Sequence, residues 1–238
     1  MRMHRFFLIV IVFSFALMFI FNRALYSEGT ELFESSPFET NPILKAIKER
    51  RSIRKFQEKD VDPGMIEILL KAASWAPSAN NDQPWKFVIV RNRETKNDIR
   101  EVLMDTLKGF YETKGIPSER MNSYWSSVFS APVHIFVFCD IRHIDMDKGW
   151  ENIENLHNIQ GVSAACQNIL LAATALDLGS LWMGGPLIVE EKIKTLLEIP
   201  QDVQLMAIIA IGYPAHEPLP PVRKPLSHFV FLEKWKEP

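Results

Sequence analysis

The chain has 238 residues, of which 47% are hydrophobic, 24% charged and 11% aromatic. This globular balance excludes disordered, collagen-like and low-complexity classes, and the length suits one large domain or two small ones. Lysine and arginine total 27 against 29 acidic residues, so the net charge of −2 does not indicate a nucleic-acid partner. The two cysteines, Cys139 and Cys166, form no CxxC pair, which excludes zinc ribbons and disulfide scaffolds.

The N-terminus carries a separate apolar segment. Residues 6–21 are apolar apart from Ser14, with basic residues before them and Arg23 after them. This pattern is typical of a membrane anchor or a cleaved secretory signal. Because no good cleavage site follows, we favour a single-pass membrane anchor over residues 1–26, with export after signal cleavage as the alternative. Beyond it, an acidic linker over 27–41 leads into the main domain, 42–238.

Two helix starts and a strand are expected in the first part of that domain. Asn41-Pro42 and Asp62-Pro63 each place a capping side chain before a proline, which predicts helices beginning at 42 and 63. A loop rich in turn formers over 75–84 precedes a strand over 85–90. Apolar residues at helical spacing then predict a helix over 99–110.

The second half is dominated by one long helix. Over 159–178 nearly every face is apolar or alanine, so we expect a buried helix ended by Gly179. The other expected elements are, in chain order, a loop or lid within 108–125, a strand over 132–139, a strand over 180–184, a helix over 190–197, a buried strand over 203–211, a proline-rich extended segment over 214–225 and a last strand over 229–232. Helices and strands alternate without a regular βαβ rhythm, which indicates an α+β fold.

The common catalytic and nucleotide motifs are missing. The sequence has no GxGxxG, P-loop, HExxH or GxSxG, and its scattered histidines indicate no metal site. A basic run does remain, and it comprises Arg50, Arg51, Ser52 and Arg54. Forked guanidinium donors with a hydroxyl suit a phosphate, although a solvated helix end explains the run more simply when it is taken alone. Arg223-Lys224 form a second basic pair that would complete a phosphate clamp if the two converged.

Two further segments have the chemistry to contact a flat ligand. The loop over 77–85 offers hydroxyl and amide groups, and such amides pair with a ring edge of alternating donors and acceptors. Met183-Gly184-Gly185 places bare backbone after a strand, where a ring can approach N–H groups closely. Taken singly, each segment is better explained as an ordinary turn.

The order of these pieces resembles the FMN-dependent nitroreductase family over roughly residues 42–232. The matching stretches are RRSIRKF (50–56), APSANNDQPWKFVIV (76–90), GVSAACQNILLAATALDLGSLWMGGP (161–186) and IIAIGYPAHEPLPPVRKPL (208–226). The resemblance implies an α+β fold with a central mixed β-sheet flanked by helices and a long buried central helix. It also implies an intertwined homodimer with one FMN in each of two interface sites.

The resemblance assigns cofactor-binding roles residue by residue. Those implied for the phosphate and ribityl chain are Arg50, Arg51, Ser52, Arg54, Arg223 and Lys224. Those implied around the isoalloxazine, in part that of the partner subunit, are Pro77, Ser78, Asn81 and Gln83. Met183, Gly184 and Gly185 match the segment whose backbone faces the flavin near N5.

The implied activity is ping-pong hydride transfer from NAD(P)H through FMN to a small aromatic acceptor such as a nitroaromatic or a quinone. Because the flavin carries the chemistry, no side chain is assigned as catalytic. The alternatives are a reductive dehalogenase or another flavin-dependent relative, or a membrane-tethered flavin-binding protein without turnover. The lid region holds residue types found in the iodotyrosine deiodinase branch without reproducing its spacing: Tyr111, Glu112, Lys114, Glu119 and Tyr124.

Overall fold

A computed structural model describes residues 37–142, 144 and 149–235 of the chain. The expected anchor, 1–26, and most of the linker lie outside the described residues. Within the described part, no helix combines the length and the apolar composition that crossing a membrane requires. The chain divides into two units, residues 1–48 and 49–238.

The described part of the first unit is helical. Helix α2 covers Pro37–Thr40 and α3 covers Pro42–Glu49. As predicted, α3 begins after Asn41, whose Oδ1 accepts hydrogen bonds from the N–H groups of Ile43 at 3.0 Å and Leu44 at 3.2 Å. This cap satisfies two of the backbone donors that the start of a helix leaves unpaired.

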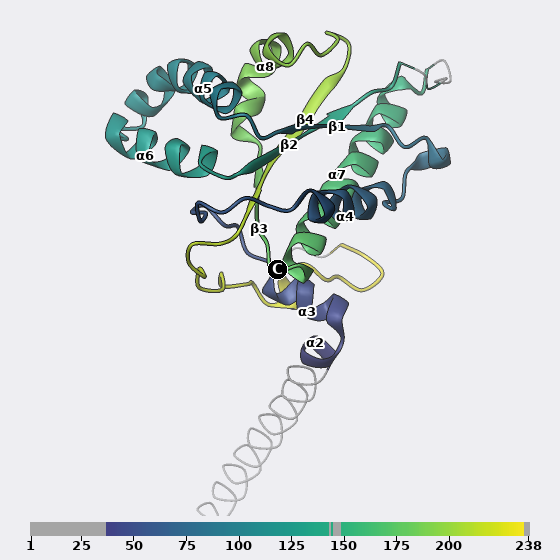
Figure 1. Cartoon of the computed structure of the whole chain (residues 1–238). Helices are drawn as coiled ribbons and strands as arrows, with labels where there is room; N and C mark the ends of the chain where they lie inside the picture. Colours follow the sequence, from purple (N-terminus) through teal and green to yellow (C-terminus); the bar gives the residue numbers. More distant parts are fainter. Residues whose placement is uncertain (1–36, 143, 145–148, 236–238) are drawn as a thin grey trace, which may run out of the picture. The chain divides into compact units, whose positions relative to one another are not determined.

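The second unit is built on a four-stranded sheet with the order β1-β2-β4-β3 (Figure 1). The strands are β1 Trp85–Val90, β2 Val133–Cys139, β3 Gly179–Met183 and β4 Gln204–Gly212. All three strand pairs are antiparallel, so the expected mixed sheet is wrong for these strands. Strand direction depends on how non-consecutive strands pair in space, which the order of elements along the chain does not fix. Among the described residues, the only parallel contact is an isolated bridge between Ser52 and Ser180.

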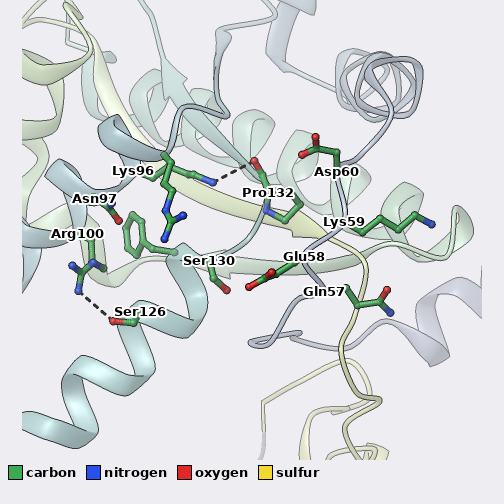
Figure 2. A pocket seen from close by; sticks show the side chains of 12 residues that line it. Gln57, Glu58, Lys59, Asp60, Lys96, Asn97, Arg100, Ser126, Ser130 and Pro132 are labelled. Carbon is green, nitrogen blue, oxygen red and sulfur yellow. Dashed lines mark hydrogen bonds between the residues drawn. The ribbon is translucent and has the colours of Figure 1, made fainter.

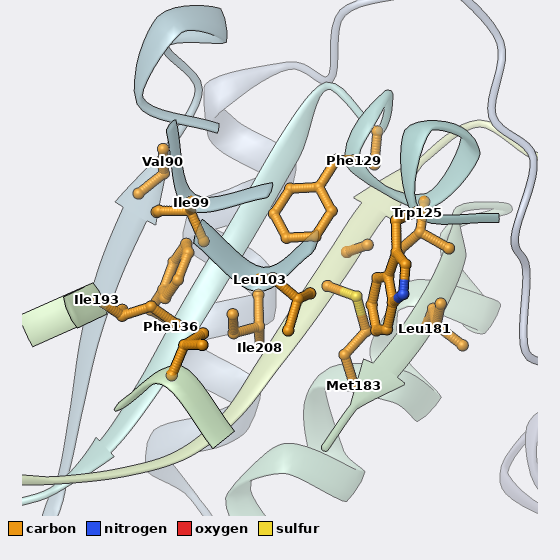
Figure 3. Close-up of a cluster of buried hydrophobic side chains, with 14 of the residues drawn as sticks. Val90, Ile99, Leu103, Trp125, Phe129, Phe136, Leu181, Met183, Ile193 and Ile208 are labelled. Atoms are coloured by element: carbon orange, nitrogen blue, oxygen red, sulfur yellow. The ribbon is translucent and has the colours of Figure 1, made fainter. Parts of the chain in front are cut away.

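Helices cover both faces of this sheet (Figure 1). One face packs against α4 Pro63–Ser74 and α7 Glu151–Ala175, and the other against α5 Arg93–Thr113, α6 Ser118–Phe129 and α8 Glu190–Leu196. Side chains of β2 alternate between the two clusters, so that Ile135 and Val137 face α7 while Phe136 and Phe138 face α5. Figure 3 shows the α5 side, where Phe136 packs near Ile193. Because both faces are covered, the central strands β2 and β4 are apolar at nearly every position. The described residues of the unit also contain three short 3-10 turns, η1 Ala79–Asn81, η2 Gly185–Val189 and η3 Leu226–His228.

The long helix α7 was predicted with the wrong ends. It begins at Glu151, eight residues earlier than expected, and stops at Ala175. Asp177 adopts a left-handed φ of 56°, and the Leu178 N–H donates to the Ala173 carbonyl at 2.8 Å, which closes the helix. Gly179 therefore opens β3 instead of ending α7. Its small size is needed for packing, since a Cβ there would lie 2.9 Å from the side chain of Ile53.

The expected loop or lid within 108–125 is a pair of helices. The end of α5 reaches Thr113, and α6 begins at Ser118 after a turn in which Gly115 has a φ of 63°. The buried residues of α6 are Met121, Trp125, Val128 and Phe129. Their helical spacing was the overlooked signal, because aromatic and polar residues between them suggested a loop.

The expected strand over 229–232 is also wrong. In the described chain this segment follows η3 and joins no strand, and its apolar side chains stay exposed, Leu232 by 84% and Phe229 by 62%. A strand requires a hydrogen-bonding partner along its edge, and apolar composition does not supply one.

One polar side chain lies inside the α5 face of the sheet. His134 of β2 is fully buried, and its ring stacks on Phe129 with 5.1 Å between the ring centroids. Burial, and then the charge of Lys96, lower the pKa of His134 to about 3. The imidazole is therefore neutral in the folded protein, although it titrates near 6.5 in an unfolded chain.

This burial predicts acid sensitivity. Below pH 6.5 His134 binds a proton in the unfolded chain, whereas in the folded protein it stays neutral down to about pH 3. The free energy of unfolding therefore falls as pH drops from 6.5 toward 3. Between pH 7.5 and pH 5 the loss should be about 2 kcal/mol. Urea unfolding at both pH values should show a shallower pH dependence for His134→Leu, while His216→Leu, at an exposed position, should keep the wild-type dependence. Equal slopes for His134→Leu and wild type would contradict the assignment.

Candidate functional site

The basic run is fixed to the sheet through its backbone. The Ile53 N–H donates to the Ser180 carbonyl at 2.9 Å, beside the bridge between Ser52 and Ser180. On the other side, the Ser127 hydroxyl of α6 donates to the Arg54 carbonyl at 2.7 Å. The run is therefore held between β3 and α6, so its side chains project from a backbone with little freedom.

Two basic segments that are distant in sequence meet beside this run. Burial lowers the pKa of Arg50, and the charges of Arg223 and then Arg51 lower it further. Repulsion of this kind acts at short range, so Arg223 lies close to Arg50. Within the described residues, neither Arg50 nor Arg223 forms an ion pair with a carboxylate. Arg223 therefore acts electrostatically on Arg50 although the two are far apart in sequence, and the positive charge, which no carboxylate of the described residues compensates, favours an anionic ligand.

The other predicted basic residues behave differently. Arg51 Nη1 donates to the Arg50 carbonyl at 3.0 Å, and Arg54 Nη1 donates to the Ser52 carbonyl at 3.2 Å. These contacts turn both guanidinium groups back along the run. Lys224 lies exposed beside His228, with 3.3 Å between Nζ and Nε2.

The predicted loop over 77–83 has a strained backbone. Asn80, Asn81 and Gln83 take left-handed φ values of 50°, 61° and 49°. The Gln83 N–H donates to Ser78 Oγ at 3.0 Å, and Gln83 Nε2 donates to the Asn81 carbonyl at 3.3 Å. Such conformations cost of order 1–3 kcal/mol each and gather at functional sites. The strain supports a binding role for the loop.

Helix α7 approaches this loop at a glycine. A Cβ on Gly161 would lie 3.3 Å from Ser78 Cβ and 3.4 Å from the Pro77 carbonyl oxygen. A cavity of about 280 Å³ opens there, and its lining includes His157 and Gln160. Neither residue was predicted as a site residue. The signal that could have found this wall was a glycine inside a helix.

The segment Met183-Gly184-Gly185 has one open and one covered glycine. Met183 is buried, and a Cβ on Gly184 would meet nothing within 4 Å. A Cβ on Gly185 would lie 3.0 Å from the Trp125 ring, which packs beside Met183 (Figure 3). Gly184 can therefore admit a ligand, whereas Gly185 makes room for Trp125.

In one chain the basic run and the strained loop lie at different points along α7. A cavity of about 390 Å³ is lined by both Arg51 and Thr174, near the end of the helix. The loop meets the same helix at Gly161, about 20 Å earlier at 1.5 Å per residue. A further cavity of about 730 Å³ is lined by none of the predicted site residues.

Comparison with known proteins defines the family. The model of the Nitroreductase family matches residues 47–213. The chain belongs to the nitroreductase family. A relative from Methanothermobacter thermautotrophicus, provisionally named an NADH dehydrogenase/NAD(P)H nitroreductase, is 36% identical over 200 residues, which is 81% of this chain and 87% of the relative.

Two more comparisons bear on the fold and on the choice of reaction. A structure of a provisionally named nitroreductase in complex with FMN, from Desulfovibrio desulfuricans, has a TM-score of 0.64 and 29% identity, covering 82% of this chain and 99% of that one. Iodotyrosine deiodinase 1 of Sus scrofa is 27% identical over 222 residues, which is 88% of this chain and 73% of the deiodinase. The α+β nitroreductase-like fold is confirmed.

The two glycines of this nitroreductase provide a matched pair of variants. In Gly185→Ala the new methyl group presses on the buried ring of Trp125. Overpacking a filled core commonly costs 1–3 kcal/mol, so we expect a stability loss of about 1 kcal/mol. Gly184→Ala, where space is open, should have a free energy of unfolding within a few tenths of a kcal/mol of the wild-type value. Urea denaturation of both variants tests this, and equal stabilities would contradict the packing.

Proposed function

We propose that this nitroreductase is an FMN-dependent oxidoreductase that transfers hydride from NADH or NADPH to a small aromatic acceptor such as a nitroaromatic or a quinone. The observation that carries the proposal is the meeting of Arg50 and Arg223, neither of which forms an ion pair with a carboxylate of the described chain. A phosphate would compensate the charge that these guanidinium groups accumulate. The relatives named as NAD(P)H nitroreductases and the FMN-bound structure support the same activity.

The residues present fit FMN. Arg50 and Arg223, with Ser52 and the neighbouring Arg51 and Arg54, would hold its phosphate and ribityl chain. The open backbone at Gly184 would lie against the isoalloxazine. The side-chain amides of Asn81 and Gln83, both on the strained loop, would then pair with the ring edge.

FMN, when bound, supplies the group that accepts and releases a hydride. The chain's own task is to bind and orient, and no side chain needs to act as acid or base. Because the sequence has no separate dinucleotide motif, donor and acceptor would use one space in turn, which is the basis for a ping-pong scheme. Trp125, packed against Gly185, would keep the Gly184 backbone in the position that faces this space.

We further propose that the enzyme works as a homodimer. The separation of about 20 Å along α7 between the loop and the basic run suits a site to which two chains contribute. Apolar side chains also stand exposed on the C-terminal segment, where Val222 is 100% and Leu219 89% exposed. Trp150, just before α7, and Leu156, within it, are exposed as well. Exposed apolar groups on this scale are typical of a surface that a partner covers.

The phosphate assignment is tested by cofactor affinity. Removing one charge-assisted hydrogen bond costs about 1.5–3 kcal/mol, so Arg50→Gln and Arg223→Gln should each raise the Kd for FMN by about 10- to 100-fold. Flavin fluorescence titration of the apoprotein measures this. Lys192→Gln, which removes an exposed charge on α8, should leave the Kd unchanged. Wild-type affinity in both arginine variants would contradict the clamp.

The activity is tested by the visible spectrum of the purified protein. Under anaerobic conditions, NADH or NADPH should bleach the flavin bands, and a nitroaromatic or a quinone should restore them. Bound FMN that neither donor reduces would instead favour a flavin-binding protein without turnover. A protein that takes up no FMN would refute the cofactor assignment.

Reductive dehalogenation is the second candidate, and the deiodinase relatives favour it. Residues of the types used by that branch stand around the turn between α5 and α6, where Tyr124 packs edge-on to Trp125 with 5.0 Å between ring centroids. Trp125 in turn touches the Gly185 segment, so this turn is near the place proposed for the acceptor. Release of halide from a halophenol by the reduced enzyme, faster than reduction of nitroaromatics, would select this reaction.

We also propose that residues 1–26 anchor the enzyme in a membrane. The apolar run over 6–21 and its flanking arginines support this, with export after cleavage as the alternative. A lysine at the centre of such a span costs about 3 kcal/mol of insertion energy, so Phe13→Lys should move the full chain from the membrane to the soluble fraction. Arg23→Lys is the matched control and should stay in the membrane fraction. Intact mass spectrometry that finds the mature chain lacking the segment would establish cleavage instead.

A further inference from the structure

A cavity beside α5 is separate from the residues assigned to FMN. It measures about 730 Å³ and lies between α5, α6 and the segment 57–60. Figure 2 shows Lys96, Asn97 and Arg100 on one side, with Glu58 and Asp60 on the other. The proposed function leaves this space without a role.

One wall of the cavity is a basic face of α5. Arg93, Lys96, Asn97 and Arg100 all line it, and their spacing places them on one side of the helix. Within the described residues, Arg93 and Lys96 form no ion pair, and Arg100 reaches only Glu101, at 3.9 Å. The two cavity carboxylates do not neutralise this face by direct contact.

Lys96 is the strongest single indication of a ligand. The residue is only 6% exposed, and its Nζ donates to the carbonyl oxygens of Ala131 at 2.8 Å and Pro132 at 3.4 Å. Both acceptors are neutral, and no carboxylate of the described residues forms an ion pair with Lys96. Burial lowers the pKa of Lys96, the nearby charge of Arg93 lowers it further, and Asp60 opposes the shift. A buried ammonium of this kind is costly unless an anion accompanies it.

The hydrogen-bonding groups around Lys96 suit an oxyanion. Arg100 Nη1 donates to Ser126 Oγ at 3.2 Å, which holds the guanidinium beside α6 (Figure 2). The side chains of Arg93 and Asn97 have no hydrogen-bond partner in the described chain. Two guanidinium forks, an ammonium and an amide therefore face one space, and this donor set matches the oxygens of a phosphate.

We propose that this cavity binds a phosphate group through Arg93, Lys96 and Arg100. Glu58 and Asp60 opposite are hydrogen-bond acceptors, so a phosphate ester that also carries hydroxyl or amino donors would use both walls. The phosphate could belong to a nicotinamide dinucleotide or be a free inorganic ion, and the two sources share the same recognition chemistry. Only the dinucleotide source rests on the proposed oxidoreductase function.

The binding test uses full-length, FMN-loaded protein in detergent, so that the FMN phosphate site is already filled. Calorimetry with adenosine 2′-monophosphate and with inorganic pyrophosphate should give saturable binding. Arg93→Gln and Arg100→Gln should each weaken it by about 10-fold or more. Both side chains lie at the surface or its margin, so folding should survive, and an unchanged flavin spectrum verifies this. Lys192→Gln, an exposed charge outside the cavity, should bind as wild type does.

Steady-state kinetics distinguishes the two sources. If Arg93→Gln raises the KM for NADPH and leaves the KM for NADH unchanged, the phosphate belongs to the dinucleotide. If both KM values are unchanged while pyrophosphate binding is lost, the site takes a free phosphate. No binding of either probe, or binding that neither arginine variant weakens, would overturn the proposal. Calorimetry needs no turnover, so failure of the oxidoreductase function would not be mistaken for failure of this site.

Discussion

The hydrogen bond between Ile53 and Ser180 is the contact on which the proposed cofactor site depends. It joins the basic run to the edge of the sheet at 2.9 Å, while Ile53 itself is buried among core side chains. Position 179 requires glycine, because a Cβ there would clash with the side chain of Ile53. A single short stretch therefore couples the sheet edge, the core and the guanidinium groups, and the placement of Arg50 follows from the packing of its neighbours.

The parts of the fold that could be predicted were those with a local cause. Asn41-Pro42 and Asp62-Pro63 mark their helix starts because capping is decided within three residues, and Asp62 does accept from the Gly64 N–H at 2.7 Å. The buried strands were visible because both faces of the sheet are covered. The antiparallel pairing, the end of α7 at Ala175 and the unpaired segment over 229–232 depend on contacts between distant parts of the chain, which no local pattern determines.

In the candidate site, too, the residue types could be predicted from the sequence, whereas the contacts between distant segments could not. The residue types of the basic run and of the loop over 77–83 were identifiable from sequence, and the family resemblance supplied their roles. The meeting of Arg50 with Arg223, the left-handed backbone at Asn80, Asn81 and Gln83, and the cover of Gly185 by Trp125 needed coordinates. The sequence also did not predict the basic wall of the α5 cavity, because charged residues at helical spacing usually form a solvated surface.

The meeting of Arg50 and Arg223 also bears on how the protein matures. The two residues lie near opposite ends of the domain's sequence. Arg223 can therefore approach Arg50 only after the sheet, α7 and the C-terminal segment have all assembled. Contacts of such long sequence separation form late, because the intervening chain must first give up its loop entropy. A ligand that binds both residues would therefore select fully assembled molecules and stabilise them in proportion to its free concentration. Binding of such a ligand would then report that the domain has folded completely. A chain truncated before residue 223 would keep its core residues but lose this binding.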